Sequence, residues 1–492
     1  MKNLGTVDMV VIGGGINGAG IARDAAGRGL SVILCEKGDL AEGTSSRSGK
    51  LIHGGLRYLE YYEFRLVREA LIEREVLLRA APHIVWPMRF VLPHSVEQRP
   101  AWLVRLGLFL YDHLGGREQL PGCRRINLRR DPEGRAIKDD YSLAFEYSDC
   151  WVDDARLVVL NALDAQQRGA KVLVRTAATS ARRADGTWKV EFRSNTGALS
   201  HVAAKALVNA AGPWVENIIN GVVGDNASRR VRLVKGSHII VKKFWDGTNA
   251  YLFQNHDKRV IFVNPYEGDK ALIGTTDIPY QGRPEDVAIG EDEIAYLLAA
   301  VNRYARTPLA REDVLASYSG VRPLYDDKSD NPSAVTRDYV FDVEGTPPLL
   351  SVFGGKITTY RKLAEHALQK LQTTFPSMGS NWTSTATLPG GDMGSGGFAS
   401  FLADFHHRFP WMTPELSLHY ARLYGTIAEK VVGDATSLTD LGPHYGSTLY
   451  KAEIDYLRHS EWAQSADDVL LRRTKSGIHI TDAQKQAVAA LF

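Results

Sequence analysis

Residues 7–36 read VDMVVIGGGINGAGIARDAAGRGLSVILCE, and this stretch decides the fold. Its apolar beginning predicts a buried parallel strand, its alanine-rich middle predicts a helix, and its apolar end predicts a second strand. Gly13, Gly15 and Gly18 follow the first strand with the G-x-G-x-x-G spacing, which serves a tight turn, close approach to a pyrophosphate and tight packing of helix on strand. Glu36 ends the second strand, where a carboxylate accepts the hydroxyls of a ribose. The stretch therefore predicts dinucleotide binding, with phosphates at the helix N-terminus, and leaves open whether the dinucleotide is FAD or NAD.

The composition is that of a large globular protein. The chain has 492 residues, of which 44% are hydrophobic and 24% charged, so two or three domains are expected. A formal net charge of +2 gives no reason to expect a nucleic-acid partner. Cys35, Cys123 and Cys150 lie far apart without a C-x-x-C pair, which argues against a disulfide framework and a zinc site. We expect a protein of the reducing cytoplasm that holds no metal.

The sequence also bears on contact with a membrane. The predicted fold begins almost at Met1, so no signal peptide is expected, and no apolar run is long enough to span a bilayer. Residues 102–111, WLVRLGLFLY, are apolar nearly all round except for Arg105. They predict either a buried helix or an interfacial helix whose arginines face lipid phosphates.

A loop rich in hydroxyl groups follows Glu36. Residues 44–60 read TSSRSGKLIHGGLRYLE. Next to a dinucleotide site, the hydroxyls can donate to phosphate and ribose, and the Gly54-Gly55 pair lets the backbone approach a flat ring. A solvated connector is the alternative, but it would not need His53, Arg57 and Tyr58 behind it, so we favour a ligand-lining loop.

Taken together, residues 13–36 and 44–60 resemble the FAD-dependent sn-glycerol-3-phosphate dehydrogenases of the bacterial aerobic respiratory type. The resemblance continues through residues 145–156 and runs to residue 492, so it is nearly full length. It implies FAD as a non-covalent cofactor, sn-glycerol 3-phosphate as substrate and a membrane quinone as electron acceptor. It also implies a monotopic protein, cytoplasmic and peripheral to the inner face of the cytoplasmic membrane. The oligomeric state stays open, with a homodimer as the form considered.

The fold class expected is α/β, a glutathione-reductase-like FAD-binding Rossmann domain with an antiparallel β-sheet cap, as in amino-acid oxidases, and a C-terminal α-helical domain. Short alternating segments between residues 236 and 274 predict the cap. Beyond Leu388 a Gly-rich linker leads into helical patterns whose chemistry is not legible. The expected borders are 1–90, 146–232 and 312–386 for the FAD-binding domain, 91–145 and 233–311 for the cap, and 387–492 for the helical domain.

Candidate substrate and catalytic residues follow from the chemistry that the resemblance implies. A phosphate dianion is best held by guanidinium groups, and the proton of the reacting hydroxyl needs a base such as neutral imidazole. Surface ion pairing is the alternative for each arginine, most of all for Arg337 beside Asp338. We expect His53, Arg57, His238 and Arg322 to be catalytic, and Arg57, Tyr58, Thr275, Arg322, Arg337 and Lys356 to bind substrate.

Candidate cofactor residues come from the glycine turns and the hydroxyl-rich loop. A turn at Gly212 ends one predicted strand, and a Gly354-Gly355 turn opens a helix whose dipole can face the flavin where reduction places negative charge. The full set expected to bind FAD is Gly13, Gly15, Gly18, Glu36, Thr44, Ser45, Ser46, Ser48, Lys50, Leu51, Gly54, Gly55, Gly212, Gly354, Gly355, Lys356 and Thr358.

The predicted function is oxidation of sn-glycerol 3-phosphate to dihydroxyacetone phosphate by hydride transfer to FAD, with the electrons passed to quinone. Two rivals stay open. One is an FAD-dependent oxidase of an amine or 2-hydroxy acid, in which the arginines would bind a carboxylate. The other is a non-catalytic flavin-fold binding protein, which the joint presence of Glu36, the 44–55 loop and the Gly354-Gly355-Lys356 turn disfavours. An NAD enzyme would leave that loop and that turn without a ligand.

Overall fold

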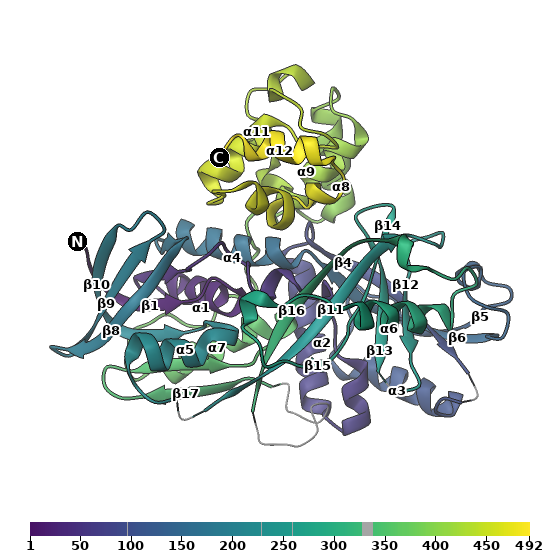
Figure 1. The fold of residues 1–492 in the computed structure, drawn as a ribbon, viewed down its shortest axis with the longest axis horizontal. Coiled ribbons are helices and arrows are strands. Elements are labelled where there is room, and N and C mark those ends of the chain that lie inside the picture. Colours follow the sequence, from purple (N-terminus) through teal and green to yellow (C-terminus); the bar gives the residue numbers. More distant parts are fainter. Residues whose placement is uncertain (96, 228, 258, 327–337) are drawn as a thin grey trace.

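A computed structural model describes residues 1–95, 97–227, 229–257, 259–326 and 338–492. Arg337, one of the predicted substrate ligands, lies outside the described residues. Figure 1 shows two sheets side by side and a helical C-terminal part standing above them. The sheets and the helical part match the fold class expected from the sequence.

The first sheet contains the dinucleotide-binding stretch. Its central strands run parallel in the order β18-β10-β1-β2-β7, with β17 antiparallel at one edge and the β8–β9 pair joined through β10. Their bounds are β1 (Lys2–Ile12), β2 (Val32–Cys35), β7 (Lys171–Leu173), β8 (Thr176–Ala184), β9 (Thr187–Ser194), β10 (Leu199–Asn209), β17 (Val340–Glu344) and β18 (Leu349–Phe353).

The last four residues of β1, residues 9–12, are buried on both faces, which explains why they are all apolar. Met9 and Val11 pack toward the helices α1 (Ile16–Gly27), α4 (Asp154–Gln167) and α7 (Tyr360–Lys370). Val10 and Ile12 point to the other face, where they meet Trp188 of β9. Side chains that alternate along a strand thus fill two cores, and the carboxyl end of β1 lies at the N-terminus of α1.

The second sheet is mainly antiparallel and forms the cap. Its main order is β15-β11-β14-β13-β12-β4-β6-β3, with β16 paired to β11 and β5 to β6. Helix α6 (Glu291–Asn302) packs on one face, and helices α2 (Phe64–Ala80) and α3 (Ala101–Leu114) pack on the other. The strands are β3 (Leu51–Ile52), β4 (Val85–His94), β5 (Arg124–Asn127), β6 (Leu143–Val152), β11 (Val231–Lys242), β12 (Ala250–Gln254), β13 (Val260–Tyr266), β14 (Lys270–Gly274), β15 (Ile278–Pro279) and β16 (Val314–Tyr325).

The sheets divide the chain differently from the predicted domain borders. Segments 1–90, 146–232 and 312–386 were expected to belong to the FAD-binding domain, yet β3, β6 and β16 pair within the second sheet. The predicted borders also cut through β4 and β6, which pair along their full lengths. Sheet membership depends on partners far away in the sequence, so local patterns could not assign these strands. The division into domains stays a prediction.

The predicted helix at residues 102–111 is real, but its buried alternative is wrong. Only Leu108 and Tyr111 of α3 are buried. Trp102, Leu106 and Phe109 are 68%, 47% and 54% exposed and recur at helical spacing on the outer face. Among the described residues no helix is long and apolar enough to cross a bilayer.

The C-terminal part is built from short helices, as predicted. It contains α8 (Gly397–Arg408), α9 (Pro414–Tyr424), α10 (Ala428–Val432), α11 (Lys451–Ser460) and α12 (Asp482–Ala489), with a π-helical turn at Asp468–Arg473. The Thr413 side chain caps the N-terminus of α9, because it accepts a hydrogen bond from the Leu416 N–H. Helix α9 packs on α8, α10 and the first-sheet side of the molecule.

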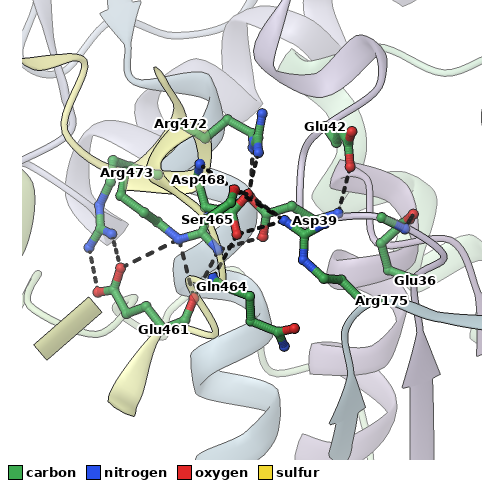
Figure 2. A network of polar contacts seen from close by, with 12 residues as sticks. Glu36, Asp39, Glu42, Arg175, Glu461, Gln464, Ser465, Asp468, Arg472 and Arg473 are labelled. Atoms are coloured by element: carbon green, nitrogen blue, oxygen red, sulfur yellow. Dashed lines mark hydrogen bonds and ion pairs between the residues drawn. The ribbon is translucent and has the colours of Figure 1, made fainter. Parts of the chain in front are cut away.

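Buried ion pairs fasten this helical part to the first sheet (Figure 2). Asp39, just past the end of β2, accepts hydrogen bonds from Arg472 at 2.6 Å and from Arg473 at 2.7 and 2.8 Å. The Asp39 and Arg473 side chains are fully buried. Arg156 of α4 pairs in the same way with Glu461. Charges that leave water need such partners, so these contacts fix the position of the helical part on the loop that follows Glu36.

Candidate active site

The glycine motif forms a cradle that has no room for side chains. At Gly13, with φ of 113°, an added Cβ would lie 2.5 Å from the Ala210 carbonyl oxygen. At Gly18 it would lie 1.9 Å from the Gly13 carbonyl oxygen, so α1 packs directly on the turn. Ser45 of the hydroxyl-rich loop accepts a hydrogen bond from the Ile16 N–H at 3.0 Å. The N-terminus of α1, where phosphates are expected, is therefore lined by backbone and one hydroxyl.

Glu36 is held at the edge of a cavity of about 450 Å³ beside this cradle. Its carboxylate accepts hydrogen bonds from the Gly14 N–H at 2.6 Å and from the Gly38 N–H at 2.8 Å. Burial raises the pKa of Glu36, and these two N–H groups oppose that effect. The carboxylate is thus fixed at the cavity edge, and its role as an acceptor for ribose hydroxyls stays a prediction.

A contact between the two sheets' loops closes the outer side of this cavity. Glu285 accepts a hydrogen bond from the Trp214 indole N–H at 2.6 Å and pairs with the Lys37 ammonium at 3.0 Å. The Lys37 ammonium also lies 4.1 Å from the centre of the Trp214 ring. All three residues line the cavity, so this group of side chains crosses its mouth.

A second cavity of about 440 Å³ continues from the first toward the cap sheet. Asn17, Thr44, Ser45, Arg47 and Gly212 line both cavities, so the two form one elongated site. The second cavity brings together most of the predicted substrate and flavin residues: Ser48, Leu51, His53, Gly55, Arg57, Tyr58, His238, Thr275, Arg322, Gly354, Gly355, Lys356 and Thr358.

Cations from three separate segments meet in this second cavity. Arg322 of β16 donates to the Thr275 hydroxyl at 3.0 Å and to Asp277 at 3.2 Å. The Lys356 ammonium lies 4.0 Å from the centre of the Tyr58 ring. Arg57 lines the cavity and has no ion-pair partner within the described part of the chain. Such a cluster gives the cavity a positive potential suited to a phosphate or carboxylate.

The two candidate bases differ in their surroundings. His238 stacks on Tyr318 with a ring-centre distance of 4.8 Å and is buried. Burial, together with Arg322 and Lys50, lowers the pKa of His238 to about 3. His53 lies 6.0 Å from the Phe262 ring, in the segment that carries Arg57 and Tyr58. Both imidazoles line the cavity, and at neutral pH His238 is uncharged.

Four predicted cofactor residues do not line either cavity. Gly18 and Gly54 act through close packing, the first against Gly13 and the second against Leu71 and Tyr111. Ser46 and Lys50 are also absent from the walls. The Lys50 ammonium is buried 2.8 Å from Asp154 of α4 and donates to the Ser46 carbonyl, so it braces the loop. Side chains of an irregular loop do not alternate with a fixed period, so the sequence could not show which of them face the cavity.

Several cavity residues were missed by the sequence interpretation. Asn17 donates to the Gly354 carbonyl at 3.2 Å and so joins the α1 N-terminus to the turn before α7. Its signal was its place inside the glycine motif. Arg47 lies in the hydroxyl-rich loop and donates to the Ser319 carbonyl at 2.9 Å. Trp214 and Glu285 carried no recognisable signal, because their contact joins segments far apart in the sequence.

Comparison with known proteins identifies this architecture. Residues 8–361 match the family described as FAD dependent oxidoreductase. The chain belongs to this family. Within the FAD dependent oxidoreductases, residues 381–492 also match the C-terminal domain of alpha-glycerophosphate oxidase, which accounts for the helical part that the sequence pattern could not interpret. The predicted cofactor, FAD, is confirmed, and so is the prediction that the protein is an FAD-dependent oxidoreductase.

Named relatives in this FAD dependent oxidoreductase family match nearly the whole chain. D-erythritol 1-phosphate dehydrogenase of Brucella abortus is 63% identical over 99% of this chain and 98% of its own length. Glycerol-3-phosphate dehydrogenase of Pseudomonas aeruginosa is 54% identical over 97% of this chain and 93% of its own. The FAD complex of the Bacillus halodurans glycerol-3-phosphate dehydrogenase covers 96% of this chain and 86% of its own, with 27% identity and a TM-score of 0.77.

Proposed function

We propose that the chain oxidises a secondary hydroxyl of a short polyol phosphate, with sn-glycerol 3-phosphate as the first candidate and dihydroxyacetone phosphate as its product. The observation that carries the proposal is the meeting of Arg57, Arg322 and Lys356 with two histidines in one cavity that continues into the dinucleotide cradle. Guanidinium and ammonium groups recognise a phosphate dianion, and an imidazole accepts the hydroxyl proton.

We propose the following roles for the cofactor and for the residues that line the cavity. FAD held in the dinucleotide cradle would supply the acceptor for the hydride of the substrate carbon. Arg57 and Lys356 hold the phosphate, and Arg322, steadied by Thr275 and Asp277, completes the anion site. We assign the hydroxyl proton to His53, because burial beside two cations disfavours the protonated form of His238. Neutral His238 then orients a substrate hydroxyl.

A second candidate substrate is D-erythritol 1-phosphate. The relative that bears this name is 63% identical, whereas the Pseudomonas glycerol-3-phosphate dehydrogenase is 54% identical. Both substrates carry a phosphate and a secondary hydroxyl, and erythritol phosphate is longer by one CHOH unit. The same cations serve both, so the choice depends on space beyond the reacting carbon.

Anaerobic bleaching of the flavin absorbance tests the proposal and separates the candidates. The purified holoenzyme is mixed with sn-glycerol 3-phosphate or D-erythritol 1-phosphate, with glycerol, glycine and lactate as controls. Bleaching by a polyol phosphate alone supports the proposal, and the ratio of the two kcat/KM values names the preferred substrate. Bleaching by glycine or lactate would instead favour an amine or 2-hydroxy-acid oxidase.

We also propose that the electrons pass to a quinone in a membrane on which α3 rests. Trp102, Leu106 and Phe109 form an exposed apolar face, and Arg105 lies among them. Tyr61, Tyr62 and Phe64, in a segment packed near α3, are also exposed. Apolar and aromatic side chains interleaved with arginine suit the headgroup region of a bilayer. The corresponding location is the inner face of the cytoplasmic membrane, and assembly as a homodimer stays a prediction.

A further inference from the structure

The loop that carries Arg57 and Tyr58 is hydrogen-bonded to a cluster of buried polar side chains that the proposed chemistry does not use. Strand β3 ends at Ile52, and His53, Gly54 and Gly55 lead into a 3-10 helix, Leu56–Tyr61. Gly55 has φ of 73°, so the chain reverses sharply there. We call residues 53–58 the substrate loop.

Tyr111 of α3 reaches this loop from the opposite side. Its phenol oxygen accepts a hydrogen bond from the Gly54 N–H at 2.7 Å and lies 2.8 Å from both carboxylate oxygens of Asp149, to which its O–H donates. Gly54 allows this approach, because a Cβ there would lie 2.7 Å from the phenol oxygen. The hydroxyl is thus engaged both as donor and as acceptor.

Asp149 is itself fixed by a cation. Arg74 of α2 donates to Asp149 at 2.8 Å and to the Ser148 carbonyl at 2.8 Å. Arg74, Tyr111 and Asp149 are all nearly inaccessible to solvent. A buried carboxylate in this position accepts a hydrogen bond from the phenol O–H. The lone pairs of the phenol oxygen then stay available to accept the hydrogen bond from the Gly54 N–H of the loop. The group joins α2, α3, β6 and the substrate loop.

We propose that Tyr111, held by Asp149 and Arg74, is a positioning residue that sets the substrate loop so that Arg57 and Tyr58 present the correct geometry to the bound anion. The inference rests on the proposed function for the role of the loop. A mispositioned guanidinium loses much of the value of a directed hydrogen bond, so the effect of losing Tyr111 falls on anion binding. The proposed role belongs to the hydroxyl group of Tyr111 and not to the packing of its ring, because phenylalanine would fill the same space.

Tyr111→Phe tests this directly, since it removes one oxygen atom and keeps the ring. We expect KM for the polyol phosphate to rise about tenfold, while kcat per bound FAD falls less than threefold and the FAD content stays full. The matched control is Tyr251→Phe, which removes another buried hydroxyl, one that donates to the Glu133 carbonyl at 2.7 Å outside the cavity. We expect the control to leave KM within twofold. A purely structural role would lower the active fraction of both variants and leave KM unchanged.

A readout that does not need turnover separates this inference from the proposed function. The holoenzyme is titrated with inorganic phosphate, and binding is monitored through the change in the flavin spectrum. The titration measures the affinity of the anion site, whichever substrate the enzyme uses. We expect the dissociation constant for phosphate to rise about tenfold in Tyr111→Phe and to stay unchanged in Tyr251→Phe. Equal phosphate affinities in wild type and Tyr111→Phe would overturn the inference, even if polyol phosphates bleach the flavin. Failure of all polyol phosphates to bleach, with the phosphate difference intact, would overturn only the proposed function.

Discussion

Arg57 lies in the cavity wall beside two other cations, and its most direct test is truncation. Arg57→Ala should raise KM for the polyol phosphate by a factor equivalent to about 2 kcal/mol and leave bound FAD in place, because a charge-assisted contact to phosphate is lost. Steady-state kinetics with measured FAD content give both quantities. Arg182→Ala, at an exposed arginine of β8, is the control and should change neither. An unchanged KM in Arg57→Ala would remove this arginine from the anion site.

Two buried histidines predict how stability depends on pH. Burial lowers the pKa of His83 and of His238 to about 3, against an ordinary value of about 6.5. Below pH 6.5 the unfolded chain takes up protons that the native protein does not, so the free energy of unfolding falls as the pH falls. Each histidine should contribute a loss of about 1 kcal/mol between pH 6.5 and 5.5.

Urea denaturation of the wild type and of His83→Phe over this pH range measures the effect. The variant lacks one of the two titrating groups, so its free energy of unfolding should decline less steeply than that of the wild type. Parallel declines in the two proteins would show that His83 is not held neutral by burial. Both proteins contain the same carboxyl groups, including buried ones such as Glu36 whose pKa is raised, so their titration cancels from the comparison.

Residues that act through backbone geometry were the most predictable. Gly13, Gly15 and Glu36 occupy the places that their spacing implied, because a tight turn and a strand end leave few alternatives. Lys50 was not predictable in the same way. Whether a loop side chain points to a cavity or to a buried acid depends on Asp154, which comes from a distant helix.

At the level of elements, α3 has two faces with different tasks. Its inner face carries Tyr111, and its outer face carries Trp102, Leu106 and Phe109. Replacing the three outer residues with serine should abolish binding to anionic lipid vesicles, because the apolar area that enters the headgroup region is lost. Vesicle co-sedimentation measures binding. Activity with a water-soluble electron acceptor should stay within twofold of wild type, and retained vesicle binding would place the membrane contact elsewhere.

The loop that carries Glu285 should control retention of the cofactor. Glu285 joins Lys37 and Trp214 across the mouth of the cavity that holds Glu36. Glu285→Gln should speed FAD dissociation about fivefold, since a partly exposed charged contact is worth about 1 kcal/mol. Recovery of free-flavin fluorescence after dilution measures the rate. The control is Asp286→Asn, at the neighbouring exposed acid. Equal dissociation rates in Glu285→Gln and Asp286→Asn would show that the Glu285 contact does not retain the cofactor.

Element types were easier to predict than element partners. Sequence patterns predicted the helix at residues 102–111 and the short strands between residues 236 and 274. It could not show that β3, β6 and β16 join the cap sheet, because hydrogen-bonded partners are set by the whole fold. The same limit hid the Tyr111–Asp149 contact, which needs α3 and β6 to be placed first.

For the whole molecule, the buried ion pairs around Asp39 should govern how firmly the helical part is attached. Asp39→Asn leaves Arg472 and Arg473 without their shared anion, and loss of one member of a buried pair costs about 3–5 kcal/mol. Thermal unfolding should therefore begin at a markedly lower temperature. Arg408→Met breaks an exposed pair with Glu429 in the same helical part and should cost about 1 kcal/mol or less. Similar losses in the two variants would contradict the role assigned to burial.

The place of Asp39 in the chain has a further consequence for biogenesis. Asp39 comes three residues after Glu36 and leaves the ribosome early, whereas Arg472 and Arg473 are translated long afterwards. During synthesis, the first sheet can form once β18 has emerged, but Asp39 lacks its arginine partners until residues 472 and 473 have followed. Chains normally fold domain by domain from the N-terminus. Here a loop that is translated early is completed by residues that are translated late, so we expect stable flavin loading only after residues 472 and 473 have emerged.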